Sequence, residues 1–254
     1  MLAIERRNAI LEKLQVERRV VVSELSALYD VSEETIRRDL DKLENDGYAI
    51  KSYGGAVINE NSNLDLPYNV RKNTNVLGKQ KIAALISEMV HDGDNIMLDA
   101  SSTAVAIAKA IKNKKDLTVI TNSLEIALEL IETPGCNVIS TGGVATGSSF
   151  ALVGSVTDKT IRSYYVDKAI ISCKGIDMYA GFTESDERHA NNKASMFYMA
   201  KTKILAIDSS KFNKIAFAKI GDLKEISKIV TDKKPEEEWL QKFEELGVEC
   251  IFPE

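Results

Sequence analysis

From residue 78 onward, short apolar runs alternate with longer segments in which apolar residues recur every three or four positions. The short runs predict buried strands, and the periodic segments predict amphipathic helices. This alternation is typical of a mostly parallel sheet covered by helices on both faces. The strands are predicted over 95–99, 117–121, 137–141, 168–173, 203–208, 228–232 and 248–252, and the helices over 79–90, 102–111, 124–132, 157–164, 191–201 and 236–246.

The first 58 residues follow a different pattern, which predicts three short helices and a small hairpin. After a first helix over 3–16, Ser23 and Ser32 are each predicted to cap one of two helices joined by a tight turn. Leu25 and Leu28 are expected to form the apolar side of the helix that Ser23 caps. In the last helix Ile36, Leu40 and Leu43 recur at i, i+4 and i+7, so they share one inward face. Residues 48–57 then predict two strands around a glycine turn. A helix-turn-helix followed by such a wing is a DNA-binding unit.

The candidate DNA contacts lie on the outward side of this unit. A rotation of about 100° per residue places Arg38 nearly opposite the apolar stripe and Arg37 to one side of it. Arginine can contact a base edge or a phosphate, and Thr35 can reach either. Lys51 can neutralise a phosphate from the wing. The predicted DNA-binding residues are Ser32, Thr35, Arg37, Arg38, Lys42, Lys51 and Tyr53.

The segment SEETIRRDLDKLENDG, followed by YGGA, resembles the winged helix of the DeoR family of bacterial transcription regulators. A helical hairpin within a core would explain a helix-turn-helix pattern alone, but not both signatures at this spacing. One departure concerns the wing, where the family usually has an arginine and this chain has Lys51-Ser52-Tyr53. The resemblance implies binding to double-stranded operator DNA.

Polar clusters follow five of the predicted strands in the larger part of the chain. They are DASST at 99–103, TNS at 121–123, TGG at 141–143, KGID at 174–177 and DSSK at 208–211. Ligands of open α/β sheets collect beyond the carboxyl ends of the strands, and small hydroxyl residues at a helix start can hold a phosphate. Each cluster alone also has an ordinary explanation, namely a helix cap, a turn or a surface lysine.

Taken together, these clusters and the GFTES segment resemble the DeoR-family sensor domain over nearly all of residues 79–233, which is similar to ribose-5-phosphate isomerase. The resemblance implies a phosphorylated sugar as effector and no cofactor. Two departures affect its identity: Lys174 replaces a frequent small residue, and 184–189 is unusually charged. The effector residues implied are Asp99, Ser101, Ser102, Thr103, Asn122, Gly142 and Gly143, with Lys174, Asp177, Glu184 and Lys211 on the other side.

Composition narrows the class of protein. The chain has 254 residues, of which 44% are hydrophobic and 28% charged, as in ordinary globular proteins. It has no apolar run long enough for a membrane span and no apolar core of a secretion signal, so we expect a cytoplasmic protein. Three dispersed cysteines indicate reduced thiols, and two histidines make a histidine-based metal site improbable.

Charge bears on the affinity for DNA. The net charge is −5, and residues 1–58 hold nine basic and eleven acidic residues, a charge of −2. DNA affinity depends on where the cations lie, yet a single head with this balance should bind weakly. We therefore expect a homodimer or homotetramer that presents two or more heads.

These observations predict an α/β chain, with a winged helix-turn-helix at 1–58, a linker at 59–77 and a Rossmann-like effector and oligomerisation domain at 78–254. We expect a repressor of a sugar catabolism operon rather than an enzyme. The alternative is a sugar-phosphate isomerase carrying a DNA-binding head, with Asp177 or Glu184 as base beside Lys174. A third interpretation is a constitutive DNA-binding scaffold.

Overall fold

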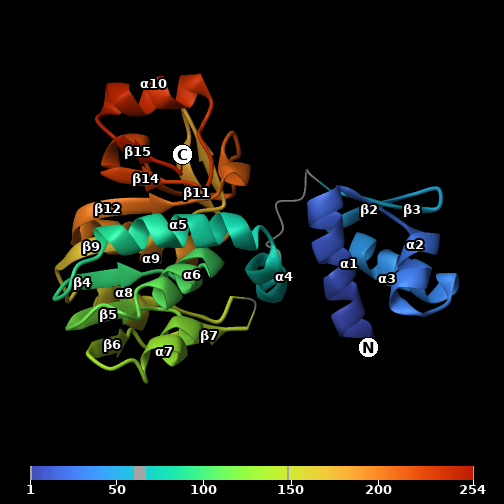
Figure 1. Ribbon diagram of the computed structural model, residues 1–254, viewed down its shortest axis with the longest axis horizontal. Coiled ribbons are helices and arrows are strands. Elements are labelled where there is room, and N and C mark those ends of the chain that lie inside the picture. The colour runs from blue at the N-terminus through green and yellow to red at the C-terminus, as the bar shows by residue number, and fades with distance from the viewer. Residues whose placement is uncertain (1, 60–66, 148, 254) are drawn as a thin grey trace. The chain divides into compact units, whose positions relative to one another are not determined.

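The computed structural model describes residues 2–59, 67–147 and 149–253, which form two units divided between Thr74 and Asn75 (Figure 1). Residues 67–74 of the predicted linker therefore belong to the first unit and residues 75–77 to the second. In the part of the chain that the structure describes, no helix combines the length and the apolar character needed to cross a membrane.

The first unit is a winged helix-turn-helix. Its elements are α1 (Ala3–Glu17), β1 (Arg19–Val21), α2 (Val22–Tyr29), α3 (Glu33–Asn45), β2 (Ala49–Ser52), β3 (Gly55–Ile58) and α4 (Tyr68–Asn73). The three strands form one antiparallel sheet in the order β1-β3-β2. Asp30, in the left-handed region, ends α2 and makes the turn before α3. Gly54 (φ +80°) allows the tight turn of the wing.

A single apolar core holds this unit together. Ile10, Leu14, Leu25 and the predicted stripe of α3 are buried in it, and Val70 of α4 joins them. Two expectations for α2 are wrong. The helix begins one residue before Ser23, with Val21 at the N-cap and no side-chain cap, because the preceding strand runs directly into it. Leu28 is exposed, and the inner side of α2 is formed by Val22 and Leu25.

The second unit is built around a seven-stranded parallel sheet in the order β15-β14-β12-β9-β4-β5-β6. The strands are β4 (Asn95–Leu98), β5 (Leu117–Thr121), β6 (Cys136–Ser140), β9 (Val166–Ile171), β12 (Ala200–Ala206), β14 (Lys228–Val230) and β15 (Glu249–Ile251). The predicted α/β class and parallel sheet are confirmed. Ile96, Val119, Ile170 and Ile204 are fully buried, because helices cover both faces of the central strands.

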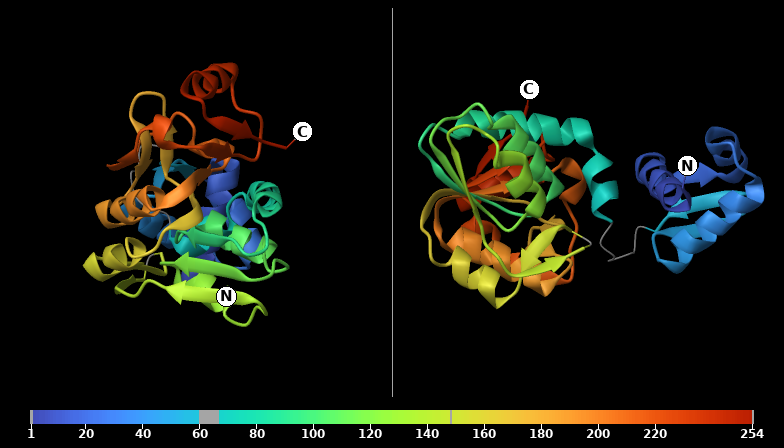
Figure 2. Two further views of the ribbon diagram at one scale, coloured as in Figure 1. Left: turned by 90° about the vertical axis from the view of Figure 1, so that its left-hand side faces the viewer. Right: turned by 90° about the horizontal axis from the view of Figure 1, so that it is seen from below.

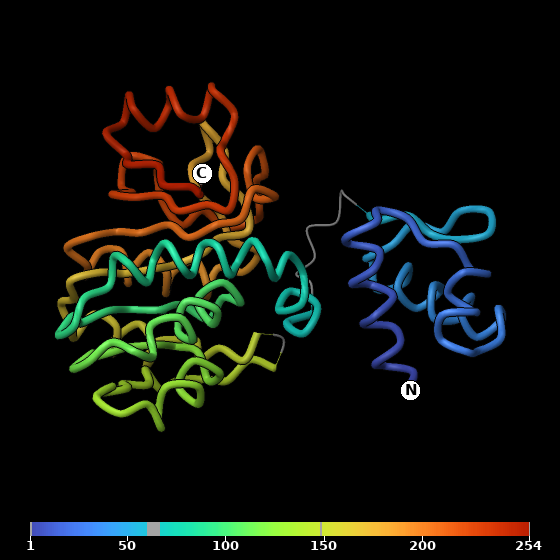
Figure 3. The backbone as a smooth tube through the Cα atoms, in the orientation of Figure 1, coloured from blue at the N-terminus to red at the C-terminus, as the bar shows by residue number. Residues whose placement is uncertain are grey.

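Helices lie on both sides of this sheet, as Figure 2 shows. One layer consists of α5 (Val76–Met89), α6 (Ser102–Ala110) and α7 (Leu124–Leu130), and the other contains α8 (Ser155–Ile161) and α9 (Glu187–Tyr198). The last helix, α10 (Glu237–Leu246), places Trp239 and Phe243 in the same core cluster as Met196 and Phe197 of α9. The chain path from β4 through α6 and α7 to β6, and back through α8 to β9, can be followed in Figure 3.

Two small antiparallel sheets were not predicted. One is the hairpin of β7 (Val144–Thr146) and β8 (Ala151–Val153), and the other joins β10 (Gly175–Asp177), β11 (Gly181–Glu184) and β13 (Ala218–Gly221). The second sheet packs against α9 and carries the GFTES segment of the sequence. The segment between β12 and β13 includes the short helix η1 (Ser209–Lys211).

Candidate functional sites

The buried residues of α3 determine which of its other residues face outward. Ser32 caps the helix, its Oγ accepting a hydrogen bond from the Thr35 amide at 3.2 Å. Besides the apolar stripe, Asp39 is buried, and its carboxylate accepts a hydrogen bond from Arg6 Nε at 2.6 Å. This buried ion pair ties α3 to α1 and leaves Arg38, the residue before Asp39, facing outward.

The predicted DNA-binding cations all lie on the surface of this unit, and each is paired with a nearby acid. The side chains of Arg37 and Arg38 are 50% and 77% exposed. The ion pairs are Arg37–Glu33, Arg38–Glu34, Lys42–Asp46 and Lys51–Asp41. Exposed pairs of this kind contribute about 1 kcal/mol or less, so a phosphate can replace the acid at little cost.

Two uncharged residues of the predicted set differ in how free they are. Tyr53 is fully exposed at the turn of the wing. Ser32 is committed to capping α3, and its hydroxyl also lies 2.9 Å from the Thr35 hydroxyl. Tyr53 therefore stays a candidate DNA contact, whereas the role that the structure gives Ser32 is to cap α3 and so position the helix.

The second candidate site lies at the carboxyl edge of the parallel sheet. From β4 the chain continues to β5 and β6, which lie on one flank of β4 in the sheet. From β9, on the other flank of β4, it continues in the opposite direction to β12. The loops after β4 and β9 therefore diverge, which is where open α/β sheets bind ligands. Asp99 follows β4, and Cys173 and Lys174 follow β9.

A buried group of three charges occupies this position, and we call Asp99, Glu184 and Lys193 the buried triad. Lys193 Nζ lies 3.2 Å from Asp99 Oδ2 and forms a shorter ion pair with Glu184 Oε2. Asp99 also accepts hydrogen bonds from Ser101 Oγ at 2.6 Å and from the Ser172 amide at 3.2 Å. The triad thereby joins β4, β9, β11 and α9.

Electrostatics keeps Glu184 and Lys193 of the triad charged. Burial alone would raise the pKa of Glu184, but Lys193, followed by Lys174, lowers it to about 2. Burial alone would lower the pKa of Lys193, but Glu184 and Asp99 raise it above its ordinary value. Burial raises the pKa of the neighbouring Cys173 thiol to about 12, so this cysteine is a neutral side chain.

Some of the predicted hydroxyls are engaged as helix caps. Ser101 Oγ accepts from the Ala104 amide at 3.0 Å while donating to Asp99. Ser123 Oγ likewise accepts from the Ile126 amide at 3.2 Å. Thr103 is buried, whereas Ser102 is half-buried. The ordinary explanation of a cap therefore holds for Ser101, although its contact with Asp99 also places it beside the triad.

Asn122, after β5, keeps an unused acceptor in a buried position. Its Nδ2 donates to the Leu152 carbonyl at 3.0 Å, but its Oδ1 has no hydrogen-bond partner among the described residues. Thr231 Oγ1, after β14, is the second such buried oxygen at the ends of these strands. Because an unpaired buried acceptor is costly, Asn122 Oδ1 is suited to accept a hydrogen bond from a ligand hydroxyl.

The glycine pair after β6 serves packing in this structure. Thr157 Oγ1 of α8 donates to the Gly142 carbonyl at 2.7 Å. A Cβ at Gly143 would collide with Thr157 and would lie 2.7 Å from the Val153 carbonyl oxygen. Both glycines also have positive φ. The pair is thus explained by the approach of α8, and its predicted role in binding remains a prediction.

The other predicted residues divide between the triad and the periphery. Lys174 and Lys211 are half-buried; Lys174 lowers the pKa of Glu184, and Lys211 is a main cause of the lowered pKa of the buried Asp208. Asp177 differs, because its Oδ1 accepts from the amides of Tyr179 and Ala180 in the β10–β11 turn. Its carboxylate has a local structural role there.

Sequence patterns did not single out several of the buried charges at this edge. Lys193 is the central example, since it sits in a helix of mixed polarity and its burial depends on acids distant in the sequence. Lys79 and Asp232 are also buried. No group of three or more His, Cys, Asp or Glu residues suited to a metal ion occurs within residues 2–59, 67–147 and 149–253.

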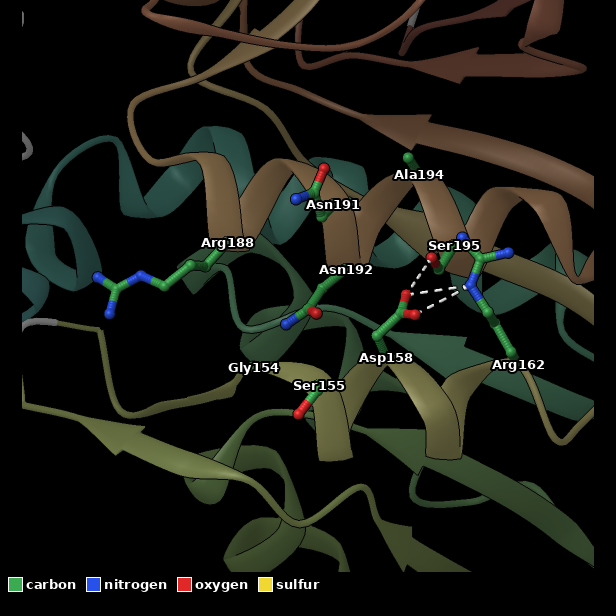
Figure 4. A pocket seen from close by; sticks show the side chains of 9 residues that line it. All are labelled: Gly154, Ser155, Asp158, Arg162, Arg188, Asn191, Asn192, Ala194 and Ser195. Carbon is green, nitrogen blue, oxygen red and sulfur yellow. Dashed lines mark hydrogen bonds and ion pairs between the residues drawn. The ribbon is translucent and has the colours of Figure 1, made fainter.

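A separate groove of about 380 Å³ lies between α8 and α9 (Figure 4). Its two arginines are already neutralised, Arg162 by Asp158 at 3.0 Å and Arg188 by Asp186 at 2.9 Å. Ser195 Oγ also donates to Asp158 at 2.5 Å. None of the predicted effector residues lines this groove.

Comparison with known proteins identifies relatives of both units. The model of the DeoR-like helix-turn-helix domain matches residues 6–62, and that of the DeoR C terminal sensor domain matches residues 74–233. The chain is 39% identical to the HTH-type transcriptional regulator YulB of Bacillus subtilis (strain 168), over 91% of this chain and 90% of that protein. It is 35% identical to the HTH-type transcriptional repressor GlcR of the same organism, over 98% and 96%.

More distant matches extend this set. The glycerol-3-phosphate regulon repressor of Escherichia coli (strain K12) is 28% identical, over 91% of each protein. Among solved structures, ribose 5-phosphate isomerase A from Methanocaldococcus jannaschii is 18% identical with a TM-score of 0.40, over 55% of each chain.

The lowered pKa of Glu184 predicts that the second unit becomes less stable in acid. Because folding lowers the pKa of Glu184 from 4.5 to about 2, its ionised form stabilises the folded unit above pH 4.5, and this stabilisation is lost as the pH falls toward about 2. We expect the urea midpoint, followed by the fluorescence of the single tryptophan, Trp239, to fall across this range. Glu184→Gln should flatten that dependence, whereas the exposed control Glu249→Gln should not. Equal slopes for Glu184→Gln and the unaltered chain would contradict the assignment.

Proposed function

The chain belongs to the DeoR family of transcriptional regulators, and on that premise we propose that it is a repressor controlled by a phosphorylated sugar. In this proposal the first unit binds operator DNA and the second unit binds the effector. Two relatives are named as a transcriptional repressor and a glycerol-3-phosphate regulon repressor. These names support repression rather than activation, and an operon of sugar catabolism.

We propose that α3 enters the major groove while the β2–β3 wing follows the phosphate backbone. Arg37 and Arg38 then exchange their acidic partners for DNA, and Lys51 contacts a phosphate. The exposure of these side chains and the low cost of their surface ion pairs support this assignment. Because the head has a charge of −2, a homodimer or homotetramer would supply the affinity that one head lacks.

We propose that the effector binds at the carboxyl edge around the buried triad, and the observation that carries this proposal is the triad itself. The two carboxylates can accept hydrogen bonds from the hydroxyls of a sugar, and the ammonium can donate hydrogen bonds to them. Asn122 Oδ1 offers a further acceptor. Since the triad carries one excess negative charge, the phosphate belongs with Lys174 and Lys211 and with the first amides of α6.

Neither Asp177 nor Glu184, the bases considered for the isomerase alternative, suits that role. Asp177 is occupied by two backbone amides. Glu184 has a pKa far below neutral and is held by Lys193, so it is a poor acceptor for a substrate proton. An effective general base has a pKa near the operating pH. The relatives compared above are named as regulators, which also favours control of transcription.

We expect Arg38→Ala to weaken binding to DNA from upstream of the chain's own gene by roughly 5- to 100-fold at moderate salt. A phosphate contact would also reduce the slope of log affinity against log salt by about one. Fluorescence anisotropy measures both quantities. Arg188→Ala is the matched control, because Arg188 is similarly exposed and paired but lies in the second unit. An affinity within twofold of the unaltered chain would contradict the role of Arg38.

The experiment that tests the proposed function titrates the same protein–DNA complex with ribose 5-phosphate, glucose 6-phosphate, fructose 1-phosphate, glycerol 3-phosphate and the unphosphorylated parents. We expect one phosphorylated compound to release the DNA and its parent to be inert. Lys211→Gln should weaken that response by roughly tenfold, since a hydrogen bond to a charged group contributes about 1.5–3 kcal/mol. The exposed Lys224→Gln should match the unaltered chain. DNA binding that no compound changes would favour the constitutive scaffold, and turnover of a compound would favour the isomerase.

A further inference from the structure

The start of the second unit is tied to the end of β14 by a side-chain hydrogen bond. Asn75, the first residue of this unit, donates from Nδ2 to Asp232 Oδ2 at 3.2 Å. Asp232 is buried, and its other oxygen, Oδ1, accepts from the Ser209 amide at 2.6 Å. One carboxylate therefore joins the residue at which the chain enters the unit to the short helix η1.

The local backbone is fitted to this connection. Asn75 has a φ of +49°, in the left-handed region that asparagine adopts more readily than most residues. A Cβ on Gly78 would lie 2.6 Å from both Asn75 Oδ1 and Asp232 Oδ2, so a larger residue there would displace the two side chains where they meet. These features show that the contact is built into the first turn of α5.

A second link joins the same two segments. Lys79 follows Gly78 and is buried. Burial alone would raise the pKa of Asp208, but Lys211, then Ser210, and further Lys79 lower it. The start of α5 thus contacts η1 through Asp232 and also acts on Asp208, the residue immediately before η1. Lys211, an effector residue in the proposed function, is the last residue of η1.

We propose that Asn75, Asp232 and the Ser209 amide form a relay that transmits effector binding to the segment leading to the DNA-binding unit. The proposal rests on the function proposed above. An effector that draws Lys211 toward its phosphate displaces η1, which alters the position of Asp232 and its hold on Asn75. The relay requires no contact between the two units, because the chain itself continues from Asn75 to the head.

The test uses the full chain with Asn75→Gly, which keeps the left-handed backbone and removes the amide. The control is Asp116→Gly, another exposed left-handed position (φ +56°) remote in sequence from the relay. The coupling is the ratio of DNA dissociation constants with and without the panel compound that releases the unaltered chain. We expect this ratio, typically about 5–150, to fall below about 2 in Asn75→Gly and to persist in Asp116→Gly.

Binding of that compound, measured by calorimetry, should persist in Asn75→Gly, and its melting temperature should match that of the control. Asn75→Asp, which sets a carboxylate against Asp232 while tolerating the same φ, should also lose coupling and is the second variant if the first does not fold. Retained coupling in either folded variant, or loss of effector binding in both, would overturn the relay. If no compound releases DNA from the unaltered chain, the proposed function fails instead.

Discussion

The ion pairs of Lys193 with Asp99 and Glu184 are the interaction on which the arrangement of the second unit depends. A lone buried ammonium would lose several kcal/mol of hydration, and the two carboxylates would repel each other without it. Together the three groups bring the end of β4, the end of β11 and the middle of α9 to one point. The Ser172 amide adds the end of β9 to this group. The triad is therefore both a structural centre and a group of buried charges beyond the sheet.

The two units use buried charge in a similar way. In the head, Arg6 and Asp39 tie α1 to the middle of α3, so that the arginine preceding Asp39 is directed outward. The predicted DNA-binding cations there are held by exposed pairs, which are weak enough to exchange for phosphate. In the second unit, Asp232 joins the start of α5 to η1. Contacts of a buried carboxylate thus hold the helices in place in both units, while exposed or unpaired polar groups are available to bind ligands.

Sequence patterns predicted those parts of the fold that depend on local rules. The cap by Ser32, the apolar stripe of α3 and the alternation of buried strands with helices follow from periodicity and capping chemistry, and all are confirmed. The β10-β11-β13 sheet was missed because its short strands have no repeating pattern and form only against α9. Ser23 was misassigned because α2 begins at Val22, directly after β1, so that Ser23 lies inside the helix.

The candidate site was predictable only in part, for the same reason. Strand ends can be located from the sequence, which brought Asp99 and Lys174 into the set. Which side chains become buried at those ends depends on partners far along the chain, so Lys193 and Asp232 were missed. Asp177 and Gly143 were included because the resemblance to the sensor domain implied them, yet a turn and the approach of α8 explain them.

A crystal structure of the full chain with the sugar phosphate that releases it from DNA would test the central claim most directly. We predict that the sugar hydroxyls contact the triad or Asn122, with the phosphate near Lys174 or Lys211. A ligand bound in the groove between α8 and α9, or anywhere remote from the triad, would contradict this account.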